Sequence, residues 1–252
     1  MNVGYNSSLY ERIAPSWPEG VPIRPGGLAL TERALSFCTF SSGDRLLDVG
    51  CGTGATLEWL IGSHGFQAFG VDPSPVLLKH GLGRNRSLPL VSARGEDLPF
   101  RTDSRDGVLL ECSLSVSHDR DKVLRECRRV LKDKGKLVLS DVFVDGKPDI
   151  SGSGCNFFSV CTAGAMPKER IQEEIRSHGF EVMLWEDHSA GLAPFIAQLL
   201  LCCDFQAFNS PGPVGSDFIG RRKGFPGLNS AGSAFGYFLL VAEKTSGVLS
   251  GE

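Results

Sequence analysis

A glycine-rich turn between an apolar segment and a helical segment constrains the fold of this chain more than any other feature. The apolar segment Leu46–Val49 leads into Gly50, Gly52 and Gly54, and a helix-forming run begins at Ala55. Glycine allows the tight turn and the close approach to a ligand that such a corner needs. Free N–H groups at the start of the helix favour a carboxylate or a phosphate. We therefore predict a strand, a glycine loop and a helix that together bind a nucleotide cofactor.

The acid before the glycines separates two kinds of cofactor. A dinucleotide fingerprint, G-x-G-x-x-G/A, is satisfied by Gly50, Gly52 and Ala55, so a nicotinamide-dependent dehydrogenase is an alternative. However, the run DVGCGTG closely resembles motif I of the class I S-adenosylmethionine-dependent methyltransferases. In that family the loop wraps the methionine and ribose end of S-adenosylmethionine. The resemblance implies cofactor contacts from Asp48, Gly50, Cys51, Gly52, Thr53 and Gly54.

A second apolar run, Phe66–Val71, also ends in an acid, Asp72. A carboxylate at this place can accept hydrogen bonds from both hydroxyls of a ribose. Either cofactor would use such a contact, so Asp72 does not discriminate between them. Pro73 and Ser74 then begin the next predicted helix and are assigned to the same cofactor site.

An acidic loop follows the third predicted strand, Leu88–Ser92. Gly95, Glu96 and Asp97 resemble the acidic loop of the methyltransferase family, in which Asp97 would accept from the adenine amino group. The form of the loop, ARGEDLPF, resembles the subgroup that contains the ubiquinone and menaquinone C-methyltransferases. The resemblance therefore implies that all three residues bind the cofactor.

Strands and helices alternate along the rest of the chain, which indicates an α/β fold. The predicted elements are strands at 106–112, 136–143, 179–185 and 236–244 and helices at 120–131 and 171–178. The family resemblance implies a three-layer sandwich around a seven-stranded, mostly parallel sheet whose last strand is antiparallel.

The length of 252 residues suits a single domain, 1–252, with insertions. We divide it into an N-terminal lid (1–43), a cofactor-binding half (44–144) and a substrate-side half (145–252). Within the last part, the apolar segment 193–208 predicts a cap helix or a homodimer contact, and 209–232 predicts a flexible loop rich in glycine and proline. Segment 145–167 is predicted to form part of the substrate wall.

Aromatic residues of the lid are expected to close over a bound ligand. They are Tyr5, Tyr10 and Trp17. Arg24 has two readings from sequence: an exposed turn residue, or a partner for an acidic group near the mouth of the site.

Composition limits the partners. The net charge of −3 and the pI of about 6.0 show no nucleic-acid footprint. Neither a secretory signal nor a run long enough to insert into a membrane is visible, so a cytoplasmic location is expected. The eight cysteines should then be thiols, and none has the spacing of a metal site.

Methyl transfer needs an acceptor aligned behind the methyl group, and a base only if the acceptor must lose a proton. The catalytic candidates are His118, Glu111 and Cys112, which end or follow the fourth predicted strand. Glu111 is also assigned to the cofactor site. Each also has a structural reading: His118 as a helix-start residue, Glu111 as a partner of backbone amides, and Cys112 as a small buried thiol. The acceptor is predicted to be a small molecule, methylated at carbon, oxygen, nitrogen or sulfur.

Two further readings remain open. Cys112, Cys155 and Cys161 could converge and bind a soft metalloid acceptor, as in the arsenite methyltransferases that share this fold. A cofactor-binding protein without catalytic activity would keep the same glycine motif.

Overall fold

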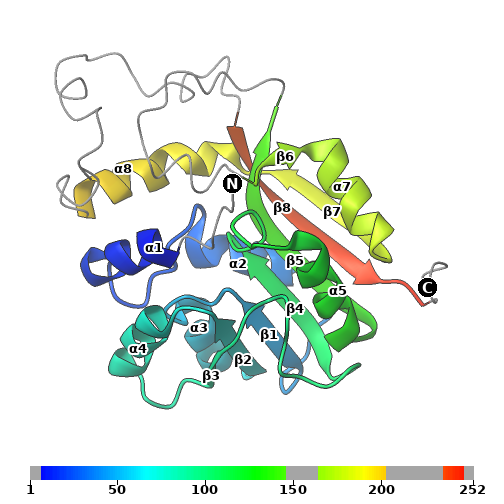
Figure 1. Cartoon of the computed structure of the whole chain (residues 1–252), viewed down its shortest axis with the longest axis horizontal. Helices are drawn as coiled ribbons and strands as arrows, with labels where there is room; N and C mark the ends of the chain where they lie inside the picture. The colour runs from blue at the N-terminus through cyan, green and yellow to red at the C-terminus, as the bar shows by residue number, and fades with distance from the viewer. Residues whose placement is uncertain (1–6, 146–163, 203–234, 247–252) are drawn as a thin grey trace.

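The computed structural model describes residues 7–145, 164–202 and 235–246, which form a twisted sheet between helices (Figure 1). The strand order is β3-β2-β1-β4-β5-β8-β7, and β8 pairs antiparallel with both of its neighbours. The strands are β1 (Arg45–Val49), β2 (Gln67–Asp72), β3 (Leu90–Ser92), β4 (Arg105–Glu111), β5 (Leu131–Val144), β7 (Phe180–Asp187) and β8 (Phe235–Lys244). A two-residue strand, β6 (Met166–Pro167), additionally pairs with β5. The predicted fold class and the antiparallel last strand are confirmed.

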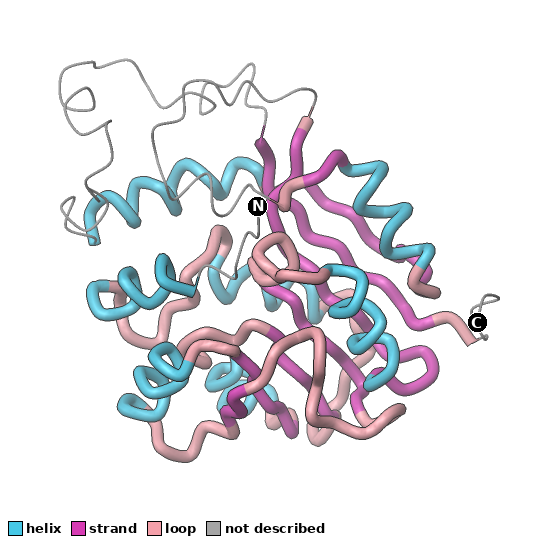
Figure 2. Tube along the Cα trace, in the orientation of Figure 1, coloured by secondary structure: helices cyan, strands magenta, loops and turns pink. Residues whose placement is uncertain are grey.

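Helices cover both faces of the sheet (Figure 2). They are α1 (Ser7–Ile13), α2 (Gly27–Leu35), α3 (Ala55–His64), α4 (Pro75–Arg84), α5 (Arg120–Val130), α7 (Lys168–Ser177) and α8 (Leu192–Cys202), with short 3-10 turns at Ala14–Ser16 and Ser189–Gly191. These bounds agree with the predicted helices to within a few residues at each end.

Side chains of each strand alternate between the two faces of the sheet, and each face carries its own hydrophobic core. Leu46 and Leu47 of β1 are both fully buried but point to opposite faces, because neighbouring side chains of a strand alternate. Leu46 packs with Leu57 of α3 on one face. Leu47 packs with Leu124 of α5 and Ile175 of α7 on the other. The result is the predicted three-layer sandwich, with the carboxyl ends of β1, β2 and β4 at one edge of the sheet.

The order of the strands changes direction at β1: β2 and β3 are added on one side of β1, and β4 and β5 on the other. β1 lies between β2 and β4 and is parallel to both. In open α/β sheets, the crevice at such a switch point, outside the carboxyl ends of the strands, is where ligands bind. The fold therefore places the glycine loop at the expected edge.

The N-terminal arm is held against α8 by apolar contacts. Ile13 and Trp17 pack with Phe195 and Leu199, and the rings of Trp17 and Phe195 have centroids 5.7 Å apart. The described part of the predicted cap helix thus supports the lid within the same chain.

Several predictions lie outside the described residues. These are Tyr5, the flexible loop 209–232, the end of the cap helix beyond Cys202, Cys155, Cys161 and most of the predicted substrate wall.

Candidate cofactor and active site

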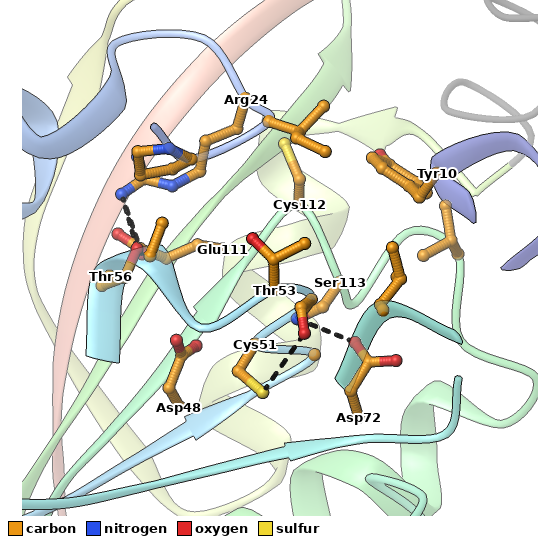
Figure 3. A pocket seen from close by; sticks show the side chains of 17 residues that line it. Tyr10, Arg24, Asp48, Cys51, Thr53, Thr56, Asp72, Glu111, Cys112 and Ser113 are labelled. Carbon is orange, nitrogen blue, oxygen red and sulfur yellow. Dashed lines mark hydrogen bonds and ion pairs between the residues drawn. The ribbon is translucent and has the colours of Figure 1, made fainter. Parts of the chain in front are cut away.

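A pocket with about 650 Å³ of open space lies over the carboxyl ends of β1, β2 and β4, beneath the N-terminal arm. The predicted site residues that line it are Asp48, Gly50, Cys51, Gly52, Thr53, Asp72, Glu111 and Cys112. Those that do not line it are Gly54, Pro73, Ser74, Gly95, Glu96, Asp97 and His118. Figure 3 shows Arg24, Thr56 and Glu111 on one side of the pocket and Tyr10 and Asp72 on the other.

The glycine loop has a shape that a side chain would disturb. Gly50 has φ +80°, and a Cβ there would lie 2.4 Å from the Cβ of Ser113. The amides of Gly50 and Cys51 both donate to the carbonyl oxygen of Val71, at 2.8 and 3.0 Å. These bonds tie the loop to the end of β2, so its backbone faces the pocket in one fixed conformation.

Asp72 is fixed by two backbone amides. Its carboxylate oxygens accept from the amide of Gly52 at 2.9 Å and from the amide of Ser74 at 2.8 Å. Burial raises the pKa of Asp72 to about 6, opposed by these two hydrogen bonds and reinforced by the nearby Glu11 carboxylate. Each carboxylate oxygen can accept more than one hydrogen bond, so Asp72 retains the capacity to bind hydroxyl groups in the pocket.

The start of α4 is capped next to Asp72. The hydroxyl of Ser74 accepts from the amide of Leu77 at 3.2 Å and donates to Glu11 at 2.6 Å. Ser74 therefore connects the lid helix α1, the start of α4 and the carboxylate of Asp72, although its side chain lies outside the pocket lining.

A buried ion pair closes the opposite end of the pocket. Arg24 and Glu111 are 2.8 Å apart, with side chains 3% and 4% exposed. The hydroxyls of Thr31 and Thr56 donate to Glu111 at 3.0 and 3.1 Å, and Arg24 donates to the carbonyl oxygen of Gly27 at 2.7 Å. Of the two readings of Arg24, the structure shows the partner of an acid. The ion pair joins the lid, α2, α3 and β4.

Asp48 lies beside this ion pair. It is 3% exposed, and burial is the main reason that its pKa is held well above its usual range. The Glu111 carboxylate raises the pKa of Asp48 further, whereas Arg24 lowers it. A cationic ligand group would favour the charged form of Asp48, so this carboxylate is suited to an ammonium group in the pocket.

Cys112 has an unusual backbone conformation for a residue other than glycine. Its φ is +55°, a region that typically costs about 1–3 kcal/mol and is often found at functional sites. Its sulfur lies 3.1 Å from the hydroxyl of Tyr237, which is fully buried and also donates to the hydroxyl of Ser140 at 3.1 Å. This chain of polar groups leads from the pocket wall into the core.

The acidic loop makes a contact that the sequence did not indicate. One oxygen of Glu96 accepts from the amides of His118 and Asp119, at 3.1 and 3.2 Å. Glu96 thus holds the start of α5 in place. The side chain of Asp97 is exposed, and the side chain of His118 faces solvent outside the pocket lining.

Replacing His118 with alanine tests the catalytic role that the sequence predicts for this residue. Loss of a general base typically lowers turnover by about 100- to 10,000-fold. Because His118 is exposed and lies outside the pocket, we expect turnover and cofactor affinity to stay close to those of the wild type. Steady-state kinetics with an accepted substrate would show this, and a fall of 100-fold or more in turnover at unchanged cofactor affinity would establish His118 as the base.

Of the described cysteines, Cys38, Cys51, Cys127 and Cys202 are free thiols, whereas Cys112 contacts the hydroxyl of Tyr237. Within residues 7–145, 164–202 and 235–246, no cluster of three or more histidine, cysteine or acidic side chains could hold a metal ion. In the same part of the chain, no helix is both long and apolar enough to cross a membrane.

The residues present suit the cofactor that the glycine motif implies. Gly50 lets the backbone of the glycine loop pack directly against Ser113, and Asp48 and Asp72 place acceptors at separate points of the pocket. A ligand with an ammonium group at one end and a ribose diol further along would match these acceptors.

Comparison with known proteins agrees with this geometry. The methyltransferase-domain family matches residues 47–139. Methyltransferase GfsG from Streptomyces halstedii is 34% identical over 241 residues, which cover 90% of this chain and 85% of the relative. O-methyltransferase resE from Aspergillus sclerotiorum is 28% identical over 211 residues, which cover 81% of this chain and 77% of the relative.

A solved structure shares the fold. Phosphoethanolamine N-methyltransferase 2 of Haemonchus contortus, in complex with S-adenosyl-L-methionine, has a TM-score of 0.73 and 21% sequence identity. The match covers 96% of this chain and 58% of that protein. The methyltransferase reading is thus supported over the dehydrogenase that the G-x-G-x-x-A pattern also allowed. The chain belongs to the class I S-adenosylmethionine-dependent methyltransferases.

Proposed function

We propose that this enzyme methylates a hydroxyl oxygen of a small, largely apolar acceptor. The observation that carries the proposal is the pocket itself, whose lining includes Tyr10, Ile23 and Val116 as well as the polar residues of the cofactor corner. The relative resE, which bears the name O-methyltransferase, supports oxygen as the methylated atom. When bound, S-adenosylmethionine supplies a methyl group on a positively charged sulfur, which is already a good leaving group.

The proposed roles of the cofactor residues follow from their places in the pocket. Asp48 accepts from the ammonium group, and the backbone of the glycine loop, with Gly50, Cys51, Gly52, Thr53 and Gly54, surrounds the methionine end. Asp72 accepts from the ribose, next to Pro73 and Ser74. On the adenine side, we retain the acidic-loop residues Gly95, Glu96 and Asp97.

Glu111 and Cys112 lie at the end of β4, where the family places groups near the transferred methyl. Because Glu111 is already bound to Arg24, Thr31 and Thr56, we propose that it positions Arg24 and the pocket wall. Cys112 forms part of the wall beside the acceptor.

We propose that alignment and exclusion of water provide most of the rate acceleration. Holding reactants in line can contribute about 7–11 kcal/mol in well-aligned systems. All five histidines, His64, His80, His118, His178 and His188, fall within the described residues, and none of them lines the pocket. We propose an acceptor with an acidic hydroxyl, such as a phenol, because such a hydroxyl can lose its proton before it enters the pocket and then needs no histidine base.

Carbon methylation is the second candidate, because the loop Gly95–Phe100 resembles that of the ubiquinone and menaquinone C-methyltransferases. Incubation with a methyl-labelled cofactor and a panel of phenols and quinols would distinguish the two. Carbon–proton correlation by NMR shows whether the labelled methyl group is attached to oxygen or to carbon. A product labelled only on carbon would contradict the O-methyltransferase proposal.

We further propose a cytoplasmic enzyme that does not bind nucleic acid and forms a homodimer through 193–208. The free thiols and the net charge of −3 support the first two points. For the homodimer, Phe195, Ile196 and Leu199 are buried within the chain, whereas Leu201 is 86% exposed. The proposed dimer contact is therefore centred on the exposed side of α8 at Leu201.

Replacing Asp72 with asparagine should weaken binding of S-adenosylhomocysteine, the demethylated cofactor. Loss of a charge-assisted contact to the ribose is worth about 1.5–3 kcal/mol, or roughly 10- to 150-fold in the dissociation constant. Calorimetry with the purified variant measures this directly. Asp106→Asn is a suitable control, because Asp106 accepts from the amide of Arg45 at the opposite end of the sheet. Equal affinity in Asp72→Asn and the wild type would exclude the ribose assignment.

The raised pKa of Asp72 also predicts a pH dependence of cofactor binding. With a pKa of about 6, the carboxylate of Asp72 is mostly protonated at pH 5 and mostly ionised at pH 8. Protonation removes acceptor capacity, so affinity should be about tenfold lower at pH 5 than at pH 8. The sign for stability is the opposite. Because the folded pKa lies above the unfolded value, Asp72 makes the cofactor-free protein less stable as the pH rises from about 4 to about 7.

The Asp72→Asn variant checks the source of this pH dependence. Its affinity for S-adenosylhomocysteine should change less between pH 5 and pH 8 than that of the wild type, and we assign any remaining change to Asp48, whose pKa is also raised. If the wild type shows no change over this range, the ionised carboxylate of Asp72 is not required.

A further inference from the structure

The loop between β4 and α5, Cys112–Asp119, forms one wall of the pocket. Cys112, Ser113 and Val116 line the pocket, whereas Leu114 and Ser115 are buried behind it. The position of this wall therefore depends on what holds the loop from behind.

Groups from three other parts of the sheet hold the loop. The hydroxyl of Ser113 donates to the carbonyl oxygen of Val49 at the end of β1, at 2.7 Å. Glu96, after β3, accepts from the amides at the end of the loop. In the middle, Asp141 of β5 accepts from the amide of Ser115 at 2.8 Å and from its hydroxyl at 2.7 Å.

Asp141 is buried beneath the loop. It is 4% exposed and also accepts from the amide of Val142 at 2.8 Å. Arg120 provides a positive charge nearby and donates to the carbonyl oxygen of Gly164 at 3.1 Å. Gly164 packs so closely on the loop that a Cβ there would lie 2.0 Å from the carbonyl oxygen of Ser115. The loop is thus held between Asp141 on one side and Gly164 on the other.

The backbone of Cys112, at the start of this loop, is strained. A cysteine at φ +55° is strained, and such strain persists only where the surroundings hold the backbone firmly. The amide of Cys112 is bound to the carbonyl oxygen of Ser140, the residue just before Asp141. The end of β5 therefore fixes both the strained residue and the centre of the loop.

We propose that Asp141 is a positioning residue for methyl transfer: through Ser115 it sets the pocket wall formed by Cys112, Ser113 and Val116. The proposal rests on the proposed cofactor site, since the same wall borders the glycine loop at Gly50. Asp141 itself does not line the pocket, so it acts through the loop. Asparagine at this position keeps the shape but replaces one acceptor oxygen with an NH2 donor. In one orientation this donor faces the amide N–H of Ser115, and in the other it faces the amide N–H of Val142.

The test compares Asp141→Asn with Asp106→Asn, a second sheet aspartate that also accepts from a backbone amide but lies far from the pocket. The first measurement is calorimetry with S-adenosylhomocysteine. The second is amide hydrogen exchange of the segment 112–119, which needs no ligand. Misplacement of a site wall by about 1 Å can lower the rate of a catalysed reaction by on the order of 100-fold, and we expect a loss of similar size, about 10- to 100-fold, in the affinity of Asp141→Asn for S-adenosylhomocysteine. Exchange of 112–119 should become faster, while Asp106→Asn matches the wild type in both measurements.

Ser115→Ala is the second variant and covers the case in which Asp141→Asn does not fold. It removes the hydroxyl bond but keeps the amide bond to Asp141, so smaller changes in the same directions are expected. Wild-type affinity and wild-type exchange in a folded Asp141→Asn, or in Ser115→Ala if only that variant folds, would overturn the proposal. If the wild type does not bind S-adenosylhomocysteine, the cofactor assignment fails, and the exchange data alone decide whether Asp141 holds the loop.

Discussion

Replacing Gly50 with alanine should remove most cofactor binding. The backbone at Gly50 has φ +80°, which costs an alanine about 1–2 kcal/mol. In addition, the new Cβ would lie 2.4 Å from the Cβ of Ser113, so the glycine loop or the loop after β4 must move. Both loops line the pocket. A shift of about 1 Å in a site can lower the reaction rate by on the order of 100-fold, and a loss of similar size is expected for cofactor binding. We therefore expect S-adenosylhomocysteine affinity to fall by about 100-fold or more.

The control variant Gly43→Ala has backbone strain but no steric clash, so it separates these two effects of Gly50→Ala. Gly43 has φ +90°, but a Cβ there would meet no atom within 4 Å, and Gly43 lies outside the pocket. This variant should lose a similar amount of stability and bind the cofactor as the wild type does. Calorimetry on both variants checks the prediction. Wild-type affinity in Gly50→Ala would mean that the loop does not approach the cofactor closely.

Replacing Arg24 with alanine should strongly destabilise the fold. Arg24 and Glu111 are almost completely buried, and removal of one partner leaves the other charge unpaired in the interior. Breaking a buried ion pair in this way typically costs about 3–5 kcal/mol. The hydroxyls of Thr31 and Thr56 remain as donors to Glu111 and should limit the loss. Urea unfolding followed by circular dichroism would measure it.

Arg33→Ala is the matched control. Arg33 also pairs with a glutamate, Glu186, but its side chain is 47% exposed, and exposed ion pairs contribute little to stability. Its removal should leave the unfolding midpoint nearly unchanged. The double variant Arg24→Met with Glu111→Leu should recover part of the stability lost in Arg24→Ala, since a well-packed apolar pair can replace a buried ion pair. An Arg24→Ala protein as stable as the wild type would contradict the role given to this pair.

The local features of the fold were predictable from the sequence. Glycines at 50, 52 and 54 all have positive φ, and the strands ending at Asp48–Val49 and at Asp72 are adjacent in the sheet. Those features follow from short-range rules of turns and of apolar runs, so the motif region was located to within a few residues.

Contacts between distant parts of the chain were not predictable in the same way. Arg24 had two readings, because its partner Glu111 meets it only after the lid folds over β4. Glu96 was assigned to the cofactor, yet its carboxylate holds amides 22 and 23 residues further along. An arginine in the lid and an acid at a strand end were the available signals, but spacing alone could not pair them.

The case of His118 shows that a position a few residues after a strand does not determine where the side chain lies. Its position after β4 suggested a place near the methyl group. The strained turn at Cys112 and the bonds of Ser113 and Ser115 direct the loop so that Val116 reaches the pocket. His118 then lies on the outside, next to Glu96. Backbone strain of this kind cannot be predicted from residue types.

Calorimetric titration of the purified protein with S-adenosylmethionine, S-adenosylhomocysteine and NADH tests the central claim most directly. The glycine loop, Asp48 and Asp72 predict binding of the first two ligands, weakened in Asp72→Asn, and no binding of NADH. Binding of NADH alone would contradict the account, because the corner would then serve a dinucleotide and Asp48 would have no ammonium group to bind.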